Sequence, residues 1–307
     1  MSEPTLTPAE RLRHPLAALN PAALLDLWRR VIIVVRCARP PQFDGGPGLA
    51  GRLRGAFGRR LWDAAILTHL PADAAGRAAL PLYDLLFDQH GRQIGGSRRP
   101  KPFVLGAELR SGGIEVTLTL FGFAGFWFAP AAQTLCEALE GGVAIADQAR
   151  VRTPLCVSDY RIERIEGVPP PAAGSAVRLH FATPFVVAQG GALTLAPAAL
   201  IASLANRIRG LARWHDLDLE MDWPETLARA AALTLTEPRL TPWLWDRRST
   251  RSGPRAIPMR GLSGAFTLSG DLAPFLPLLA IGETTHLGSG TTFGLGRYVL
   301  QPQPELG

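Results

Sequence analysis

A proline-rich segment near the middle of the chain constrains its fold more than any other feature. Residues Gly167–Ala176 read GVPPPAAGSA, and a proline run cannot continue a helix or a central strand. The small residues around the prolines contribute little to a hydrophobic core. We therefore predict a linker that joins two domains, residues 1–167 and residues 177–307, each about the size of a single domain.

The two parts share one order of predicted elements. In the first part, the β-branched run Val31–Val35 predicts a buried strand, and a helix is predicted over Leu49–Ala65 after a glycine-rich turn. In the second part, Val177–Phe181 predicts a strand and Ala198–Trp214 a helix with one apolar face. Because further strands follow in each part, the sequence predicts two α+β sandwiches of the split βαβ kind, with helices on one face of an antiparallel sheet.

One uncharged stretch, Val116–Cys136, is long enough to be mistaken for a membrane span. Its start alternates apolar and polar residues at period two, which predicts a half-buried strand followed by an apolar loop and a helix start. The N-terminus is polar and lacks the apolar core of a signal peptide. The cysteines Cys37, Cys136 and Cys156 form no CxxC pair, so we expect neither a disulfide framework nor a zinc knuckle. Together these features predict a cytoplasmic protein without membrane contact.

The charge of the chain is strongly basic. It carries 32 basic and 26 acidic residues, a net charge of +6 and a sequence pI near 10.0, and Lys101 is its single lysine. A GC-rich genome would replace lysine by arginine without a functional cause. Alternatively, the arginines bind phosphate groups in bidentate fashion, as basic nucleic-acid-binding proteins do.

A glycine-rich segment near the C-terminus is the most specific motif. Within Gly282–Tyr298, glycines stand at 288, 290, 294 and 296, a spacing that permits close backbone approach and exposes successive N–H groups to an anion. The segment is therefore either a phosphate cradle or a hairpin turn. A dinucleotide fold is excluded because prolines interrupt the short tail that follows, and a P-loop is excluded because no Gly-Lys-[Ser/Thr] occurs.

A second basic segment precedes the glycine-rich one. Trp245–Arg255 sets four arginines among serine, glycine and proline, which predicts a basic surface loop rather than a core element. Such a loop is either a solvated connection or a set of phosphate contacts. The candidate phosphate-binding residues are Arg247, Arg248, Arg251, Arg255, Gly288, Gly290, Gly294, Gly296 and Arg297.

These motifs resemble a known family. Five segments of the second half carry the resemblance: TPF, LANRIRGL, RRSTRSG, PMRGLSGAFTLSG and GETTHLGSGTTFGLGRY, which begin at Thr183, Leu204, Arg247, Pro258 and Gly282. They are similar to the CRISPR-associated endoribonucleases of the RAMP superfamily that process CRISPR precursor RNA. The first half resembles the family more loosely, through LRGAFGRRLW at 53–62. The resemblance implies two ferredoxin-like domains in tandem, an RNA-gripping glycine-rich loop, and metal-independent cleavage by attack of a ribose 2′-hydroxyl on the adjacent phosphate.

The family's usual histidine around the first helix of the first domain has no counterpart, because no histidine occurs between His14 and His69. Two catalytic hypotheses remain. His286 acts as general acid or base, although a loop histidine is more often a hydrogen-bonding contact. Alternatively, arginines stabilise the developing phosphorane charge. The arginine candidates lie in the first helix and are Arg52, Arg54, Arg59 and Arg60; a structural role is the more common outcome for Arg60, which falls close to the apolar stripe.

Other polar residues receive structural expectations. Asp216, Asp218, Glu220 and Asp222 alternate with apolar residues and predict one acidic face of a solvated edge strand rather than a metal site. We expect core packing for Tyr83 and Tyr298 and a core or edge contact for His180. Surface positions are expected for His14, His69, His90 and His215.

The resemblance, together with the basic charge, implies a metal-independent endoribonuclease that needs no cofactor and cuts CRISPR precursor RNA at the repeat hairpin. Its expected partners are this RNA hairpin and other subunits of a CRISPR effector complex. A different class of function is a non-catalytic subunit that only holds the guide RNA. A third is a basic globular protein whose arginines reflect genome composition alone, for which affinity for RNA would not fall steeply with salt.

Overall fold

The computed structural model describes residues 8–38, 40, 46, 48–68, 80–87, 99–144, 152–248 and 256–302. The chain forms two compact units. The first contains residues 1–18, 29–165 and 210–218, and the second contains residues 19–28, 166–209 and 219–307. The main division falls between Ile165 and Glu166, just before the proline-rich segment. Residues 19–28 belong to the second unit although the segments on either side belong to the first, and residues 210–218 belong to the first unit although the segments on either side belong to the second.

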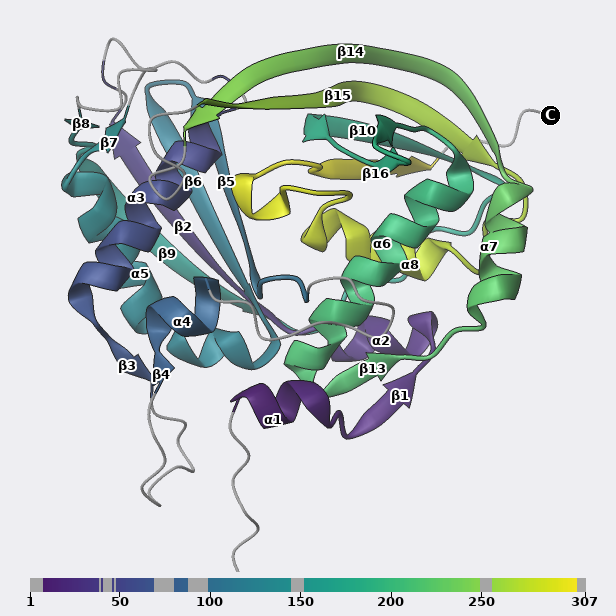
Figure 1. Ribbon diagram of the computed structural model, residues 1–307, viewed down its shortest axis with the longest axis horizontal. Helices are drawn as coiled ribbons and strands as arrows, with labels where there is room; N and C mark the ends of the chain where they lie inside the picture. Colours follow the sequence, from purple (N-terminus) through teal and green to yellow (C-terminus); the bar gives the residue numbers. More distant parts are fainter. Residues whose placement is uncertain are drawn as a thin grey trace, which may run out of the picture. The chain divides into compact units, whose positions relative to one another are not determined.

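The first unit is built on a four-stranded antiparallel sheet in the order β5-β6-β2-β9 (Figure 1). In chain order its main elements are β2 (Arg30–Ala38), α3 (Leu49–Ala64), β5 (Phe103–Arg110), β6 (Gly113–Phe121), α5 (Phe128–Glu140) and β9 (Val157–Ile165). Numbered by chain order, the strands stand 2-3-1-4 across the sheet. This is the arrangement of a ferredoxin-like βαββαβ unit.

The helices of the first unit follow from the apolar periodicity of the sequence. On α3, Leu53, Phe57 and Leu61 are all fully buried, as their spacing of four predicts for one helix face. The uncharged stretch forms β6, the 3₁₀ turn η1 (Gly122–Trp127) and α5, which confirms the predicted strand, loop and helix start. No helix in the described part of the chain is long and apolar enough to cross a membrane.

The second unit repeats the same topology, with the sheet order β14-β15-β10-β16. Its elements are β10 (Ala176–Phe185), α6 (Pro197–Ala212), β14 (Thr234–Arg248), β15 (Ala256–Ser269), α8 (Leu276–Thr285) and β16 (Tyr298–Pro302). Helices α6 and α8 lie on one side of this sheet (Figure 1). The fold is therefore two ferredoxin-like domains in tandem, as predicted.

Shorter elements complete the two units. They are α1 (Pro8–Arg13), β1 (Ala17–Leu19), α2 (Pro21–Leu27), β3 (Leu67–Thr68), β4 (Leu80–Pro81), α4 (Leu82–Phe87), β7 (Val143–Ala144), β8 (Arg152–Thr153), β11 (Ala188–Gln189), β12 (Ala192–Leu193), η2 (Arg213–His215), β13 (Leu217–Leu219), α7 (Trp223–Ala231) and η3 (Thr291–Phe293). The helix predicted to reach Trp214 thus ends at Ala212, and a 3₁₀ turn continues it.

Two expectations for residues 215–222 were wrong. His215 is not at the surface but only 3% exposed, and its ring nitrogens lie 3.0 Å from Leu211 O and 2.9 Å from Arg29 O. The acidic strand face does not form either, because β13 covers only Leu217–Leu219. Asp216 is instead buried in an ion pair with Arg11, since a carboxylate that leaves water needs a charged partner.

Candidate functional site

The glycine-rich loop connects α8 to β16 in the second unit. Gly288, Gly290, Gly294 and Gly296 all have positive φ, at +88°, +75°, +77° and +74°, a region that L-residues rarely occupy. Space is also restricted, because a Cβ on Gly296 would overlap the carbonyl oxygen of Leu287. The glycines are therefore required by the backbone path itself, whatever the loop binds.

Many backbone N–H groups of the loop donate hydrogen bonds within the second unit, either to the loop itself or to residues 183–186. Leu287 N–H donates to Gly296 O at 2.9 Å, Ser289 N–H to Val186 O at 2.9 Å, and Gly296 N–H to Pro184 O at 2.9 Å. The N–H groups that donate within the unit are those of Leu287, Ser289, Phe293, Gly294, Leu295, Gly296 and Arg297. The expectation that the loop exposes its N–H groups in succession was wrong for these seven residues, because their N–H groups donate to oxygen atoms of the loop or of residues 183–186.

His286 lies at the start of the loop and caps α8. Its side chain is 6% exposed, and Nδ1 lies 3.1 Å from Leu295 O. Because a carbonyl can only accept, Nδ1 carries the proton in this contact. Burial, aided by the charge of Arg207, lowers the pKa of His286 to about 3, so the ring is neutral at pH 7.

Arg207 lies close to this histidine. Its Nε donates to Thr285 O at 2.6 Å, at the last turn of α8, and burial lowers the pKa of its guanidinium to about 9. The cationic side chain therefore binds a carbonyl at the C-terminus of α8, where positive charge is favourable. Arg207 and His286 together fix the point at which α8 turns into the loop.

Arg297 ends the loop, and its backbone is held on both sides. Its N–H donates to Thr183 Oγ1 at 2.9 Å, and its carbonyl accepts from Ala182 N–H at 2.9 Å. The side chain is half-buried, and burial lowers the pKa of its guanidinium. Thr183 belongs to the TPF segment of the sequence, so this motif anchors the loop to β10.

The basic segment around Arg247 was expected as a loop, but its first part is strand. β14 runs through Arg248, and register pairs Arg247 with Ile257 and Arg248 with Ala256 on β15. β14 and β15 form the long curved ribbon of Figure 1. The side chains of Arg247 and Arg248 and the whole of Arg251 and Arg255 lie outside the described residues.

The four candidate arginines of α3 belong to the first unit and differ in their surroundings. Arg54 is half-buried, with its guanidinium carbon 4.8 Å from the centre of the Phe87 ring. Arg60 is an exposed partner of Glu137, 2.7 Å from its carboxylate, so it has the structural pairing expected of it, at the surface rather than in the core. Arg59 is exposed and Arg52 half-buried.

One cation beside Arg54 was missed by sequence reasoning. Lys101 donates a hydrogen bond to Phe87 O, and its Nζ lies 5.7 Å from the centre of the same ring over which Arg54 lies. The only sequence signal was that Lys101 is the single lysine of the chain. Arg54 and Lys101 thus bring two positive charges to one aromatic side chain, a cation–π arrangement.

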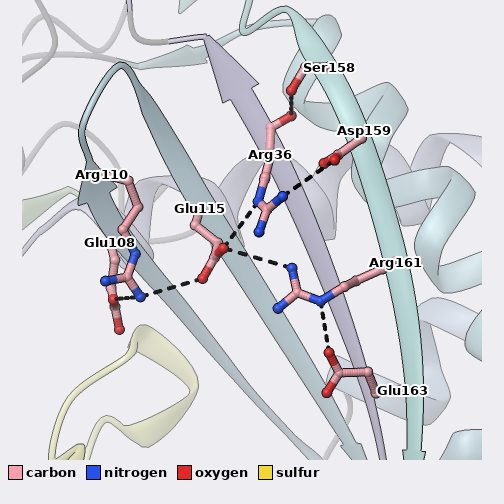
Figure 2. Close-up of polar contacts among 8 residues, drawn as sticks. All are labelled: Arg36, Glu108, Arg110, Glu115, Ser158, Asp159, Arg161 and Glu163. Atoms are coloured by element: carbon pink, nitrogen blue, oxygen red, sulfur yellow. Dashed lines mark hydrogen bonds and ion pairs between the residues drawn. The ribbon is translucent and has the colours of Figure 1, made fainter.

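The outer end of the first sheet carries a network of charged side chains (Figure 2). Glu115 on β6 accepts from Arg36 at 3.3 Å and lies 3.6 Å from Arg110 and 3.9 Å from Arg161. The drawn network contains three arginines and four acids: Arg36, Arg110, Arg161, Glu108, Glu115, Asp159 and Glu163. Because its acids outnumber its bases, this part of the sheet is a poor match for a polyanion.

The structure describes the two sets of catalytic candidates in separate units: the α3 arginines lie in the first and His286 in the second. Within the described ranges, no group of three or more His, Cys, Asp or Glu side chains is arranged to hold a metal ion.

Comparison with known proteins gives a family match for part of the chain and a fold for most of it. Residues 179–298 match the family model described as CRISPR-associated endoribonuclease Cas6, while no curated protein matches the chain. A solved Cas6 (TTHB231) in a product complex has 17% identity and a TM-score of 0.53, over 89% of this chain and 99% of that one. A second, Cas6 (TTHA0078) in a product complex, has 18% identity and a TM-score of 0.54, over 89% and 100%.

These solved structures share the tandem ferredoxin-like fold over most of this chain. Because the sequence identities are below 20%, the similarity shows the fold alone. The family match covers α6, the β14–β15 ribbon, α8 and the glycine-rich loop. The resemblance expected from the sequence is thus confirmed: residues 179–298 carry the pattern of the CRISPR-associated Cas6 endoribonucleases, and the chain has their fold.

Proposed function

We propose that this protein is an endoribonuclease that cuts CRISPR precursor RNA at the repeat hairpin and releases mature guide RNA. The observation that carries the proposal is the match of residues 179–298 to the Cas6 family. The basic charge supports it, because a net charge of +6 favours a nucleic-acid partner. The proposed RNA contacts are the arginines of the β14–β15 ribbon and Arg297, with other subunits of an effector complex as further partners.

The proposed chemistry needs no metal ion. A ribose 2′-hydroxyl attacks the adjacent phosphorus, gives its proton to water and forms a new P–O bond. The bond to the 5′-oxygen of the next nucleotide breaks, and that oxygen takes up a proton from water. The protein must align these atoms and stabilise the charge on the phosphorane oxygens. Guanidinium groups suit the second task because they are permanently charged and bind two oxygens at once.

Between the two catalytic hypotheses, the surroundings of the residues favour the arginines. His286 is buried and neutral, with its Nδ1–H committed to Leu295 O, so its ring is adapted to hold the loop. On α3, Arg59 is exposed, and Arg54 is half-buried beside Lys101. We therefore assign charge stabilisation to Arg52, Arg54 and Arg59, and a structural role to His286 and Arg60.

The test is incubation of the purified protein with the host's repeat hairpin RNA in EDTA, beside matched RNAs that carry one 2′-deoxy sugar at each candidate position. We expect one cut that persists in EDTA and disappears with a single deoxy substitution. A cut that requires added Mg²⁺, or one that survives every deoxy substitution, would refute attack by the 2′-hydroxyl.

A second candidate function is a subunit that holds guide RNA without cutting it. It is favoured by two observations: α3 has no histidine, and the loop histidine is buried. Tight, salt-sensitive binding of the repeat hairpin with no cleavage in the same assay would establish this function, and absence of any binding would remove both.

A further inference from the structure

Three arginines from distant segments of the sequence gather in the first unit, away from the motifs discussed above. Arg13 ends helix α1, Arg99 precedes β5, and Arg213 lies in the turn η2. Arg213 links η2 to the end of α1, because its Nη1 donates to Arg13 O at 3.2 Å. Arg99 is near enough to both arginines for their charges to lower the pKa of its guanidinium. We call Arg13, Arg99 and Arg213 the arginine cluster.

The cluster lies on a well-fixed base. Arg213 forms a hydrogen-bonded ion pair with Asp218, and both side chains are largely buried, at 13% and 16% exposed. On the same helix as Arg13, Arg11 Nε donates to Asp216 at 2.8 Å, and its guanidinium lies 4.6 Å from the centre of the Phe123 ring. These contacts hold α1 against η2, so Arg213 serves to position its neighbours.

Two of the cluster's charges lack an acidic partner. Asp218 is paired with Arg213 and Asp216 with Arg11, and the described residues provide no ion pair for Arg13 or Arg99. Arg99 Nη1 is also buried without a hydrogen-bond partner in the described part of the chain. Burial, then the charges of Arg213 and Arg13, lower the pKa of Arg99, with Asp218 acting in the opposite direction.

Such an arrangement is unfavourable unless an anion joins it. Like charges at short range repel, and a buried donor without an acceptor costs about 1–3 kcal/mol. A phosphate group removes both penalties at once, because its oxygens accept from two guanidinium groups. The charge network of Figure 2 shows the opposite solution, in which every arginine has a carboxylate within the chain.

We propose that Arg13 and Arg99 bind a backbone phosphate of the RNA, with Arg213 holding the end of α1 that carries Arg13. This inference rests on the proposed function, since it names a contact of the same RNA. Arg13 is exposed and Arg99 half-exposed, so both residues are accessible to a ligand on the surface. The contact reads the phosphate backbone rather than the bases, and therefore contributes affinity without sequence preference.

The experiment compares two double variants with equal change in charge. Arg13→Ala with Arg99→Ala removes the proposed contact, while Arg36→Ala with Arg161→Ala removes two arginines from the charge network, and each lowers the net charge from +6 to +4. Affinity for the repeat hairpin is measured by fluorescence anisotropy over a series of salt concentrations. For the cluster variant we expect affinity about tenfold lower or more, and a slope of log affinity on log salt reduced by about 1.

Each outcome has a distinct meaning. Equal affinity and slope for the two double variants, with RNA cutting intact in the unmodified protein, would overturn the phosphate contact and leave the proposed function standing. Failure of the unmodified protein to bind the hairpin would overturn both. Should the cluster variant unfold, Arg13→Ala alone keeps the test decisive, because this exposed side chain can be removed while its carbonyl still accepts from Arg213; unchanged affinity and slope in that variant would refute the role of Arg13.

Discussion

The two ferredoxin-like units have the same strand order but use it in different ways. In the first, the helix after the first strand presents arginines at its surface, and the connection from α5 to β9 carries no glycine-rich motif. In the second, the corresponding connection from α8 to β16 is the glycine-rich loop, with five residues at positive φ, namely His286 and four glycines. One topology thus supplies charged side chains in one copy and a fixed backbone turn in the other.

This difference determines how each unit should respond to substitution. Arginine side chains at a surface are long and act by charge, so their loss should change RNA chemistry while leaving the fold intact. The loop acts through its backbone conformation and its hydrogen bonds within the second unit, so a substitution in it should first reduce the stability of the fold. The predictions below compare these two responses.

The largest effect is expected for Gly296→Ala in the second unit. The new Cβ would overlap Leu287 O, and φ is +74°, so the hydrogen bond from Leu287 N–H to Gly296 O cannot keep its geometry. We expect the free energy of unfolding to fall by about 3 kcal/mol or more, with loss of RNA cutting. Urea denaturation and the cleavage assay measure the two effects.

Gly112→Ala in the first unit is the matched control. Its φ is +83°, but nothing lies within 4 Å of the added Cβ, so only conformational strain remains, about 1 kcal/mol. Equal destabilisation by the two variants would show that the loop is no more constrained than an ordinary hairpin turn.

The next effect concerns the arginines of α3. Arg54→Ala should reduce the single-turnover cutting rate by about 10²-fold, because it removes a donor for the phosphorane charge, while RNA affinity changes little. His286→Gln should keep a rate closer to that of the unmodified protein at 25 °C and pH 7. A rate lost with His286→Gln in a folded protein, and kept with Arg54→Ala, would reverse the assignment of catalysis between the two units.

Acid should destabilise both units through one buried histidine each. Burial lowers the pKa of His215 to about 4 in the first unit, and burial with the charge of Arg207 lowers that of His286 to about 3 in the second. The unfolded rings take up a proton below about pH 6.5 while the folded rings do not. Stability from these groups is therefore complete above pH 6.5 and lost as the pH falls.

We expect each histidine to cost about 1.4 kcal/mol per pH unit in this range, or about 2 kcal/mol by pH 5. Urea denaturation at pH 7 and pH 5 measures this loss, and His286→Gln should reduce it by its own share. His180→Gln, at an exposed position of β10, should leave it unchanged. A free energy of unfolding equal at the two pH values would contradict the burial of both rings.

Local periodicity accounts for what the sequence revealed correctly. Helix α3 and strand β2 were predicted because their apolar residues recur at the spacing of one buried face. The segment from Trp245 was expected as a loop from its arginine, serine, glycine and proline content, yet Trp245–Arg248 belong to a strand. This composition indicates that the side chains are exposed to solvent. A two-stranded ribbon can have exposed side chains, because pairing of its backbones does not require a buried side-chain face.

Tertiary contacts account for what sequence reasoning could not find. His215 has charged neighbours in sequence, but its burial depends on Arg29 O, 186 residues away. The arginine cluster likewise gathers residues from three distant segments, and no spacing in the sequence marks them as neighbours. The glycine-rich loop was recognisable as a motif, whereas the use of its N–H groups by Pro184 and Val186 follows only from the folded chain.

The smallest effect is expected for the exposed pair of Arg60 and Glu137. The hydrogen bond from Arg60, with a second from Gln133, lowers the pKa of Glu137, so the pair stabilises the fold above the ordinary glutamate pKa and loses this effect as the pH falls through the lowered one. Both side chains are solvated, at 46% and 34% exposed. Arg60→Ala should therefore cost less than about 1 kcal/mol at pH 7 and leave RNA cutting unchanged, measured by urea denaturation and the cleavage assay. A large loss of cutting in this variant, with stability retained, would add Arg60 to the charge-stabilising arginines of α3, next to Arg59, and remove it from the structural residues.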